Sequence, residues 1–297
     1  MHDKEQPSTI DWFLADMRTY FDDTQPSLLA LFDIYAEEAA FGRRYIASDL
    51  ESLPIGAKIL EVGAGSLLLS CQLIREGFQV TALEPIGTGF SHFEQMRQTV
   101  LARAATLGCL PRNLDIVAES LTESETFDYA FSINVMEHVE NISIAIARIV
   151  KSLKMGSSYR FTSPNYLFPY EPHFNIPTLF SKRVTEKMLG KKIFGSKKIA
   201  DPAGTWQSLN WINVIQVRKI VQQLPGLKVI FNRCLLVVTI ERIASDPDFA
   251  SRRSSMIRII LLLLLKSQLH RLLQFVPAAL QPIIDCKLQK AMVSEAS

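Results

Sequence analysis

The chain has 297 residues, enough for one large domain or for one domain with sizeable additions. Hydrophobic residues make up 48% of it and charged residues 21%, which excludes an intrinsically disordered protein. The net charge of +2 is unevenly spread: residues 1–51 hold eleven acidic and four basic side chains, and residues 251–297 hold seven basic and two acidic ones. A basic second half favours an anionic partner, either a phosphorylated substrate or a membrane surface, or else solvated helix faces.

The N-terminal part of the chain is expected to be helical. In residues 8–52 the large apolar side chains Trp12, Phe13, Met17 and Tyr20 recur at helical spacing. We assign residues 1–52 to an N-terminal helical cap. This polar, acidic start has no signal-peptide core, and the four cysteines have no paired spacing. Both features indicate a cytoplasmic protein without a zinc or disulfide framework.

Short apolar runs then alternate with amphipathic stretches. The pattern predicts strands at 58–62, 78–83, 114–118, 127–133, 157–163, 228–232 and 235–241, and helices at 67–76, 89–107, 141–153 and 209–224. Such alternation indicates an α/β fold: a doubly wound, mostly parallel seven-stranded sheet with helices on both faces. We place this domain at residues 53–243.

Two segments depart from the alternation. Residues 164–206 contain five prolines and many aromatic side chains, and we expect them to form a lid inserted in the domain. Residues 244–297 are expected to form C-terminal helices: the seven apolar residues 259–265 precede a basic amphipathic stretch at 266–276. The apolar run is too short to span a bilayer, which needs about 20 residues. Peripheral membrane contact through 257–276, packing on the domain and a homodimer interface all remain open.

The most informative motif is Glu61-Val-Gly63-Ala64-Gly65, which follows the first predicted strand. The second strand ends in Glu84-Pro85, so an acidic residue stands 21 positions after Gly63. Doubly wound sheets hold a nucleoside with this layout, because the glycines admit the ligand and the acid accepts hydrogen bonds from ribose hydroxyls. A dinucleotide fingerprint would carry Gly or Ala at position 68, where Leu68 stands.

Acid-x-Gly-x-Gly after a strand, with an acid closing the next strand, resembles motif I of class I S-adenosylmethionine-dependent methyltransferases. The resemblance covers about residues 42–242 and implies a Rossmann-like fold with S-adenosylmethionine as cofactor. It implies that Glu61 orients the methionine ammonium group, and that the turn from Gly63 through Ala64 to Gly65 passes beneath the amino-acid half of the cofactor. Glu84 and Pro85 would lie at the ribose. Glu119 would contact the adenine amino group, or else be an exposed loop carboxylate.

The fourth strand ends in Asn134-Val-Met-Glu137-His138-Val. Glu-His-Val at this place resembles the ubiquinone-biosynthesis O-methyltransferases, some of which bind a divalent metal through Glu-x-x-Glu-His. Here Asn134 replaces the first acid, so we expect no metal and assign Asn134 to the cofactor pocket. His138 is expected to act as a base or as a pocket residue, with a purely structural histidine as the alternative.

His173 lies in the predicted lid, two positions after Glu171. Among aromatic neighbours it could deprotonate a hydroxyl in a water-poor pocket, or the lid could serve packing alone. No Asn/Asp-Pro-Pro-aromatic motif follows the fourth strand and no basic-aromatic stripe is present, which argues against a nucleic-acid substrate.

The chain is therefore predicted to methylate a small molecule, at oxygen. The basic, apolar C-terminus favours a lipid-linked or membrane-associated acceptor at the inner membrane face. One alternative is a soluble methyltransferase for a sugar or another polar metabolite. Another is a non-catalytic cofactor-binding scaffold, which the intact set of cofactor contacts speaks against.

Overall fold

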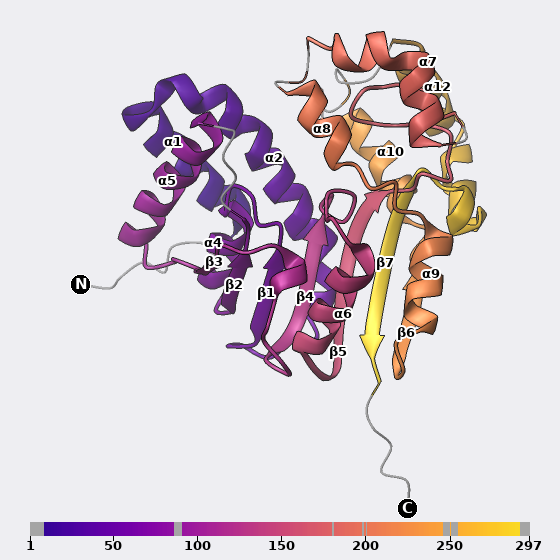
Figure 1. Cartoon of the computed structure of the whole chain (residues 1–297). Coiled ribbons are helices and arrows are strands. Elements are labelled where there is room, and N and C mark those ends of the chain that lie inside the picture. The colour runs from indigo at the N-terminus through magenta and orange to yellow at the C-terminus, as the bar shows by residue number, and fades with distance from the viewer. Residues whose placement is uncertain are drawn as a thin grey trace, which may run out of the picture. The chain divides into compact units, whose positions relative to one another are not determined.

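The computed structural model describes residues 9–85, 91–179, 181–197, 199, 201–245, 250 and 255–291. The strands are β1 (Lys58–Val62), β2 (Gln79–Leu83), β3 (Arg112–Leu114), β4 (Phe127–Ile133), β5 (Leu153–Pro164), β6 (Leu227–Phe231) and β7 (Ile283–Lys290). They form one sheet in the order β3-β2-β1-β4-β5-β7-β6, in which β7 is antiparallel (Figure 1). The predicted α/β, mostly parallel seven-stranded sheet is confirmed.

The chain divides into two compact units. The first comprises residues 1–133, 144–159 and 290–297, and the second comprises 134–143 and 160–289. The helices up to β5 are α1 (Ile10–Thr24), α2 (Leu29–Tyr45), α3 (Ala47–Leu50), α4 (Leu68–Arg75), α5 (Ser91–Thr106) and α6 (Ile142–Ser152). Short 3₁₀ turns, η1 (Pro26–Leu28) and η2 (Ala118–Ser120), lie between them.

Helix α1 shows why the N-terminal segment is helical. The hydroxyl of Thr9 accepts a hydrogen bond from the backbone N–H of Trp12 at 3.4 Å and so caps the first turn. Phe13, Met17 and Phe21 follow at intervals of four and are fully buried. This face packs against α2, α4 and α5 within the first unit, which confirms the predicted N-terminal helices.

The parallel core of the sheet determines the edge at which ligands can bind. Strand β1 pairs in parallel with β2 on one side and with β4 on the other, in a register that sets Glu61 beside Ala82 and Phe131. The carboxyl ends of these strands therefore meet at one edge of the sheet, which is where open α/β sheets bind ligands. Residues 63–65 and 84–85 follow directly from that edge.

The second unit contains α7 (Lys182–Phe194), α8 (Pro202–Ser208), α9 (Val214–Gln222), α10 (Leu235–Ser245) and α12 (Ser255–Lys266), with the 3₁₀ segments η3 (Leu269–Phe275) and η4 (Ala278–Leu280). The predicted lid thus includes two capped helices: the side chain of Ser181 accepts from the N–H of Val184, and that of Asp201 accepts from Gly204. Residues 165–179, between β5 and α7, have no regular element beyond an isolated bridge between Glu171 and Ile176.

Four element predictions were wrong, and the last of them concerns β7, described below. Residues 235–241 form helix α10 instead of a strand; Ile240 and Ile243 are buried while Val238 is 49% exposed, and a strand covered on both faces would bury all three. Residues 114–118 hold the end of β3 and the start of η2. In 266–276 the α-helix ends at Lys266, because Gln268 adopts a left-handed φ of 58° and a 3₁₀ segment follows.

Strand β7 lies in the segment that was predicted to be helical. Its side chains at alternate positions, Ile284, Cys286 and Leu288, are buried. Asp285 accepts hydrogen bonds from Arg160 on β5 at 3.1 and 3.0 Å, and from the side chain of Asn232, just after β6, at 2.8 Å. One buried carboxylate thus joins three neighbouring strands.

Candidate active site

The turn after β1 is held against the end of β2 by the backbone. The N–H groups of Gly63 and Ala64 both donate to the carbonyl of Leu83, at 2.7 and 3.3 Å. Gly63 and Gly65 have φ of 72° and 49°, in the left-handed region that other residues rarely adopt. The two glycines are therefore required by the turn itself, and they leave backbone without side chains at the ligand edge of the sheet.

Glu84 lies beside this turn. The N–H of Gly65 donates to its Oε2 at 3.0 Å, so the carboxylate is fixed in orientation before any ligand binds. Burial raises the pKa of Glu84, while the Gly65 N–H and the charge of Arg97 oppose that shift. Pro85, the next residue, is exposed. The structure thus brings together two of the sequence-predicted cofactor contacts.

Glu61 is 6% exposed at the end of β1. The hydroxyl of Ser70 on α4 donates a hydrogen bond to its Oε2. Burial raises the pKa of Glu61 to about 8, the Ser70 hydrogen bond lowers it, and the charge of Glu84 raises it further. A buried carboxyl group in this setting ionises readily only beside a cation. Sequence reasoning missed Ser70, because nothing local distinguishes it from other helix residues.

The two remaining predicted cofactor contacts stand apart from the glycine turn in the chain. Glu119 lies in η2 and is half-buried. Asn134 follows β4 in the left-handed conformation, with φ of 55°, which asparagine tolerates. Its Oδ1 accepts from the hydroxyl of Thr162 on β5 at 3.3 Å, and its N–H donates to the Thr162 carbonyl at 3.1 Å.

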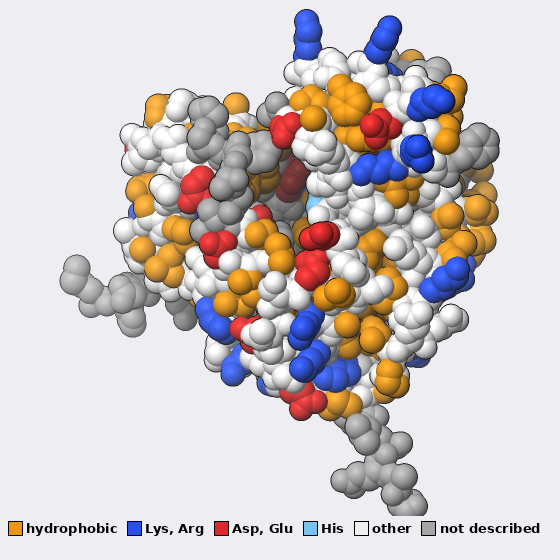
Figure 2. Space-filling model, in the orientation of Figure 1, with side chains coloured by type: hydrophobic (Ala, Val, Ile, Leu, Met, Phe, Trp, Pro, Cys, Tyr) orange, Lys and Arg blue, Asp and Glu red, His pale blue; other side chains and the backbone are white. Residues whose placement is uncertain are grey.

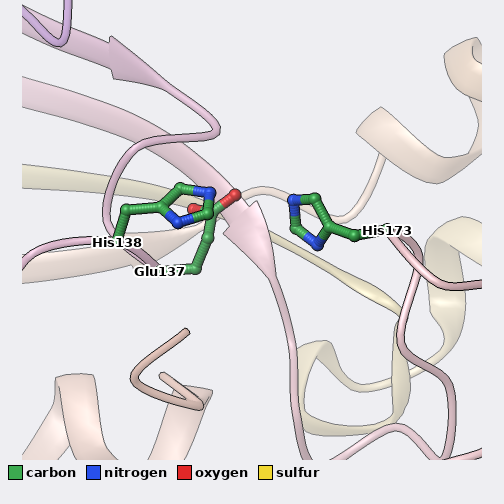
Figure 3. A group of neighbouring side chains, drawn as sticks. All are labelled: Glu137, His138 and His173. Atoms are coloured by element: carbon green, nitrogen blue, oxygen red, sulfur yellow. The ribbon is translucent and has the colours of Figure 1, made fainter. Parts of the chain in front are cut away.

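Glu137, His138 and His173 come together although 35 positions separate the two histidines (Figure 3). One potential ligand atom from each of the three side chains lies within 4.8 Å of the others. The two imidazole rings meet edge to face, with centroids 5.4 Å apart. Glu137 is fully buried; its Oε2 accepts from the hydroxyl of Ser163 at 3.0 Å. Its Oε1 is buried and accepts no hydrogen bond from any described residue.

The hydrogen bonds of His138 determine its tautomer. Its Nδ1 lies 2.9 Å from the hydroxyl oxygen of Ser208, whose proton is donated to the carbonyl of Thr205 at 2.9 Å. Because a hydroxyl has one proton, Nδ1 must carry its own and donate it. Desolvation by the surrounding protein and repulsion from His173 lower the pKa of His138 to about 4, although the residue as a whole is exposed. His138 is therefore neutral at pH 7, with its lone pair on Nε2.

His173 is oriented by Glu171. Its Nδ1 lies 2.6 Å from Oε1 of that fully buried carboxylate, which also accepts from the backbone N–H groups of His173 and Phe174 and from the hydroxyl of Tyr166. Nδ1 of His173 therefore carries the proton, and the neutral ring has its lone pair on Nε2. Burial alone would lower the pKa of His173, but the hydrogen bond and charge of Glu171, with the charge of Glu137, raise it overall.

The segment before α9 holds this group in place. The side chain of Asn210 donates to the carbonyls of Met136 and Val139, at 2.7 and 2.8 Å, and its N–H donates to the carbonyl of Glu137 at 2.8 Å. Trp211 stacks on Tyr166, with ring centroids 5.1 Å apart. Sequence reasoning missed Ser208 and Asn210, because nothing local distinguishes them from ordinary helix-end and turn residues.

When Glu137 is ionised and both rings are neutral, the three side chains offer lone pairs without a donor among them. Burial raises the pKa of Glu137 to about 7, although hydrogen bonds and the charge of His173 oppose the shift. Such an arrangement attracts a proton, a hydroxyl group of a ligand or a metal cation, and two imidazoles with one carboxylate are a donor set that divalent cations accept. The residues present therefore fit a metal ion.

Comparison with known proteins identifies the family. Residues 60–161, from β1 into β5, match the family described as "Methyltransferase domain". The chain belongs to the class I S-adenosylmethionine-dependent methyltransferases. The cofactor of this methyltransferase is thus S-adenosylmethionine, as its sequence predicts. It is 45% identical over 281 residues to a protein of Mycobacterium tuberculosis that is described as uncharacterised, with 95% of each chain covered.

Other similarities are more distant. The methyltransferase is 31% identical over 163 residues to a ubiquinone biosynthesis O-methyltransferase of Paramagnetospirillum magneticum, covering 52% of this chain and 61% of that one. Phosphoethanolamine N-methyltransferase 2 of Haemonchus contortus superposes with a TM-score of 0.48 at 17% identity, covering 93% of this chain and 60% of that one. A putative sarcosine dimethylglycine methyltransferase of Galdieria sulphuraria gives 0.48 at 16% identity, covering 86% and 87%. Neither solved structure bears on the acceptor.

Proposed function

We propose that this small-molecule methyltransferase transfers the methyl group to an oxygen atom, and that Glu137, His138 and His173 promote loss of the acceptor's proton. The observation that carries the proposal is the convergence of Glu137, His138 and His173, in which Oε1 of Glu137 accepts no hydrogen bond from any described residue. A hydroxyl group donates its proton into such a group and becomes a better nucleophile. His138 and His173 are the proposed catalytic residues.

The proposed cofactor contacts lie in the first unit, except Asn134, which belongs to the second. Glu61 would pair with the methionine ammonium group, since a buried carboxyl group gains most from a cation. Residues 63–65 would admit the amino-acid half, and Glu84 with Pro85 would lie at the ribose, Glu84 fixed by the N–H of Gly65. Glu119 is proposed to contact the adenine, and Asn134 to border the cofactor pocket. Methyl transfer then depends on alignment of donor and acceptor.

The same three side chains would hold a divalent cation, if one is bound, through Oε1 of Glu137 and Nε2 of each histidine. Such a cation lowers the pKa of a hydroxyl that it binds. With or without a cation, Glu171 and Ser208 orient the two imidazole rings, and Asn210 holds the backbone of residues 136–139.

An apolar, lipid-linked acceptor is favoured by the surface of residues 255–280. On α12 and the 3₁₀ segments after it, Ile259, Leu263, Leu272, Phe275 and Leu280 are between 57% and 67% exposed. Figure 2 shows hydrophobic side chains along the right-hand edge of the view, where Figure 1 draws the segment that follows α12. Contiguous apolar surface of this kind marks interaction sites.

The charge of this surface favours an anionic membrane as its occupant. Residues 255–281 contain no aspartate or glutamate, whereas Arg258, Lys266 and Arg271 are exposed among the apolar side chains. Among the described helices none is long and apolar enough to cross a bilayer. A basic, apolar surface without a span is typical of interfacial contact.

Replacement of His173 by Asn tests the catalytic proposal. We expect turnover to fall by ~10²–10⁴-fold, which is what proton abstraction supplies, while affinity for S-adenosylmethionine is kept. Turnover is measured as transfer of labelled methyl groups to a lipid extract and to a polar metabolite extract. Tyr170→Phe, which removes a hydroxyl bonded to Asn175 in the same loop, is the matched control. Equal turnover of wild type and His173→Asn contradicts the catalytic proposal. If methyl groups are transferred only to the polar metabolite extract, the acceptor is a polar metabolite and the lipid-linked acceptor is wrong.

Sedimentation with lipid vesicles tests the surface. We expect the wild type to bind anionic but not neutral vesicles and to be released by salt, since each basic residue contributes ~1 kcal/mol that salt screens. Leu263→Glu combined with Leu272→Glu should abolish binding. Ile55→Glu, at an apolar residue of the first unit that is 89% exposed, should have no effect. The membrane proposal is contradicted if the wild type does not bind vesicles but forms a dimer that the double variant dissociates. The surface then binds a second copy of the chain.

A further inference from the structure

We propose that Glu137, His138 and His173 form a binding site for a divalent transition-metal ion, with His173 as the ligand that replaces the missing acid at position 134. The expectation of a metal-free site considered residues 134–138 alone. The structure adds a third ligand from the loop after β5. The proposal concerns the same site as the proposed function but does not depend on the acceptor.

The protonation pattern leaves three lone pairs directed at one another. Nδ1 of His138 donates to Ser208 and Nδ1 of His173 donates to Glu171, so each ring has only Nε2 left for a ligand. Oε1 of Glu137 is buried and accepts no hydrogen bond from any described residue. Figure 3 shows the Glu137 carboxylate directed into the space between the two rings. Lone pairs repel one another in a desolvated site, and a cation among them removes the repulsion.

The spacing requires little adjustment. The three ligand atoms lie within 4.8 Å of one another. Three atoms at most 4.8 Å from one another lie at most ~2.8 Å from a common centre, so a shift of ~0.7 Å by each side chain gives bonds of ~2.1 Å. Three protein ligands also leave coordination positions open for an acceptor oxygen, as in catalytic metal sites.

The donor types select the metal. Two imidazole nitrogens and one carboxylate oxygen suit Zn²⁺, Mn²⁺, Fe²⁺ or Co²⁺, whereas Mg²⁺ and Ca²⁺ prefer oxygen ligands alone. Asn134 stands where the Glu-x-x-Glu-His motif has its first acid, and its Oδ1 accepts a hydrogen bond from the hydroxyl of Thr162. The ligand set therefore differs from an oxygen-rich Glu-x-x-Glu-His site, and its metal preference should differ as well.

Each ligand has the supporting hydrogen bond that metal sites require. Glu171 holds His173, Ser208 holds His138, and Ser163 donates to the second oxygen of Glu137. Such partners fix the tautomer and the ring orientation, and their removal typically lowers metal affinity by ~10–100-fold. Glu171 is thus a positioning residue whose effect on the site is measurable without catalysis.

The test uses the full chain, stripped of metal with a chelator and free of acceptor and cofactor. It is titrated with Co²⁺ by calorimetry and by visible absorption, which reports the cobalt coordination. We expect one Co²⁺ per chain, displacement by Zn²⁺ and no displacement by excess Mg²⁺. His173→Asn and Glu137→Gln should lose the site, Glu171→Gln should weaken binding by ~10–100-fold, and Tyr170→Phe should bind as wild type.

Folding of each variant is checked by its melting temperature and by its affinity for S-adenosylmethionine. If Glu137→Gln fails to fold, His173→Asn, altered at a loop residue, decides the question. The proposal is overturned if the wild type binds no stoichiometric Co²⁺, or if His173→Asn binds it as tightly as wild type. Because the readout is metal binding, loss of the site and failure of the proposed methyl transfer are distinguished.

Discussion

Ionisation of Glu61 should couple cofactor binding to pH. Its pKa in the cofactor-free protein is about 8, so the buried carboxyl group is mostly protonated at pH 6. If Glu61 pairs with the methionine ammonium, the bound cofactor favours the ionised form and lowers this pKa. Binding below pH 8 must then release a proton, and affinity must rise with pH.

The size of the effect follows from the difference between the pH of the measurement and the pKa of Glu61. Two pH units below about 8, roughly 1% of the carboxyl groups are ionised, which costs ~2.7 kcal/mol at 1.36 kcal/mol per unit. Affinity should therefore rise by up to ~100-fold between pH 6 and pH 8. Above pH 8 it should fall again, because an α-amino group has a pKa of ~7.7–8.0 and the cofactor loses its own charge.

Isothermal titration calorimetry of S-adenosylmethionine in buffers of different ionisation enthalpy measures both affinity and proton release. Glu61→Gln, which keeps an oxygen for the Ser70 hydroxyl, should bind weakly and without the rise between pH 6 and pH 8. Without cofactor, the stability contributed by Glu61 declines as pH rises from 4.5 to about 8, because the folded state holds the proton more tightly. Equal affinity at pH 6 and pH 8 with no proton release would refute the assignment of the ammonium to Glu61.

Two further predictions concern carboxylates. Glu84→Ala removes the acceptor of the Gly65 N–H and the proposed partner of the ribose. It should cost ~1.5–3 kcal/mol of cofactor binding free energy by calorimetry, and wild-type affinity in this variant would contradict the proposed ribose contact. Asp285→Ala removes the buried carboxylate that pairs with the 11%-exposed Arg160 and should lower the free energy of unfolding in urea by ~3–5 kcal/mol, whereas exposed Gln289→Ala should change little. A loss in Asp285→Ala no larger than in Gln289→Ala contradicts the importance of this contact.

The sequence predicted most of the parallel core because its signals there are local and agree with one another. Strands 58–62 and 127–133 match β1 and β4 in every residue, and the glycine turn lies between elements of the predicted types. The failure at 235–241 has a physical cause: a short, uniformly apolar run fits a buried strand and a buried helix equally well. Strand β7 had a readable signal, since Ile284, Cys286 and Leu288 alternate with polar residues, but the preceding apolar block dominated the interpretation of residues 244–297.

The candidate site was harder to predict, because its geometry depends on contacts between distant segments. His138 and His173 were singled out separately, each for its own surroundings in the chain, and nothing in either segment indicates that their rings meet. The tautomers depend on Ser208 and Glu171, and the orphaned oxygen of Glu137 is visible only once the neighbours are in place. The expectation of no metal rested on Asn134, which replaces the first acid of the Glu-x-x-Glu-His motif.

The position of β7 between β5 and β6 has a consequence for how the chain acquires its structure. Strand β6 is synthesised some fifty residues before β7, yet β7 is its only neighbour in the sheet. Until β7 emerges, the backbone edges of β5 and β6 have no strand between them, and exposed strand edges recruit other chains. A nascent chain that ends before residue 283 would present both edges at once, so shortened products of this protein should aggregate instead of accumulating as smaller soluble methyltransferases.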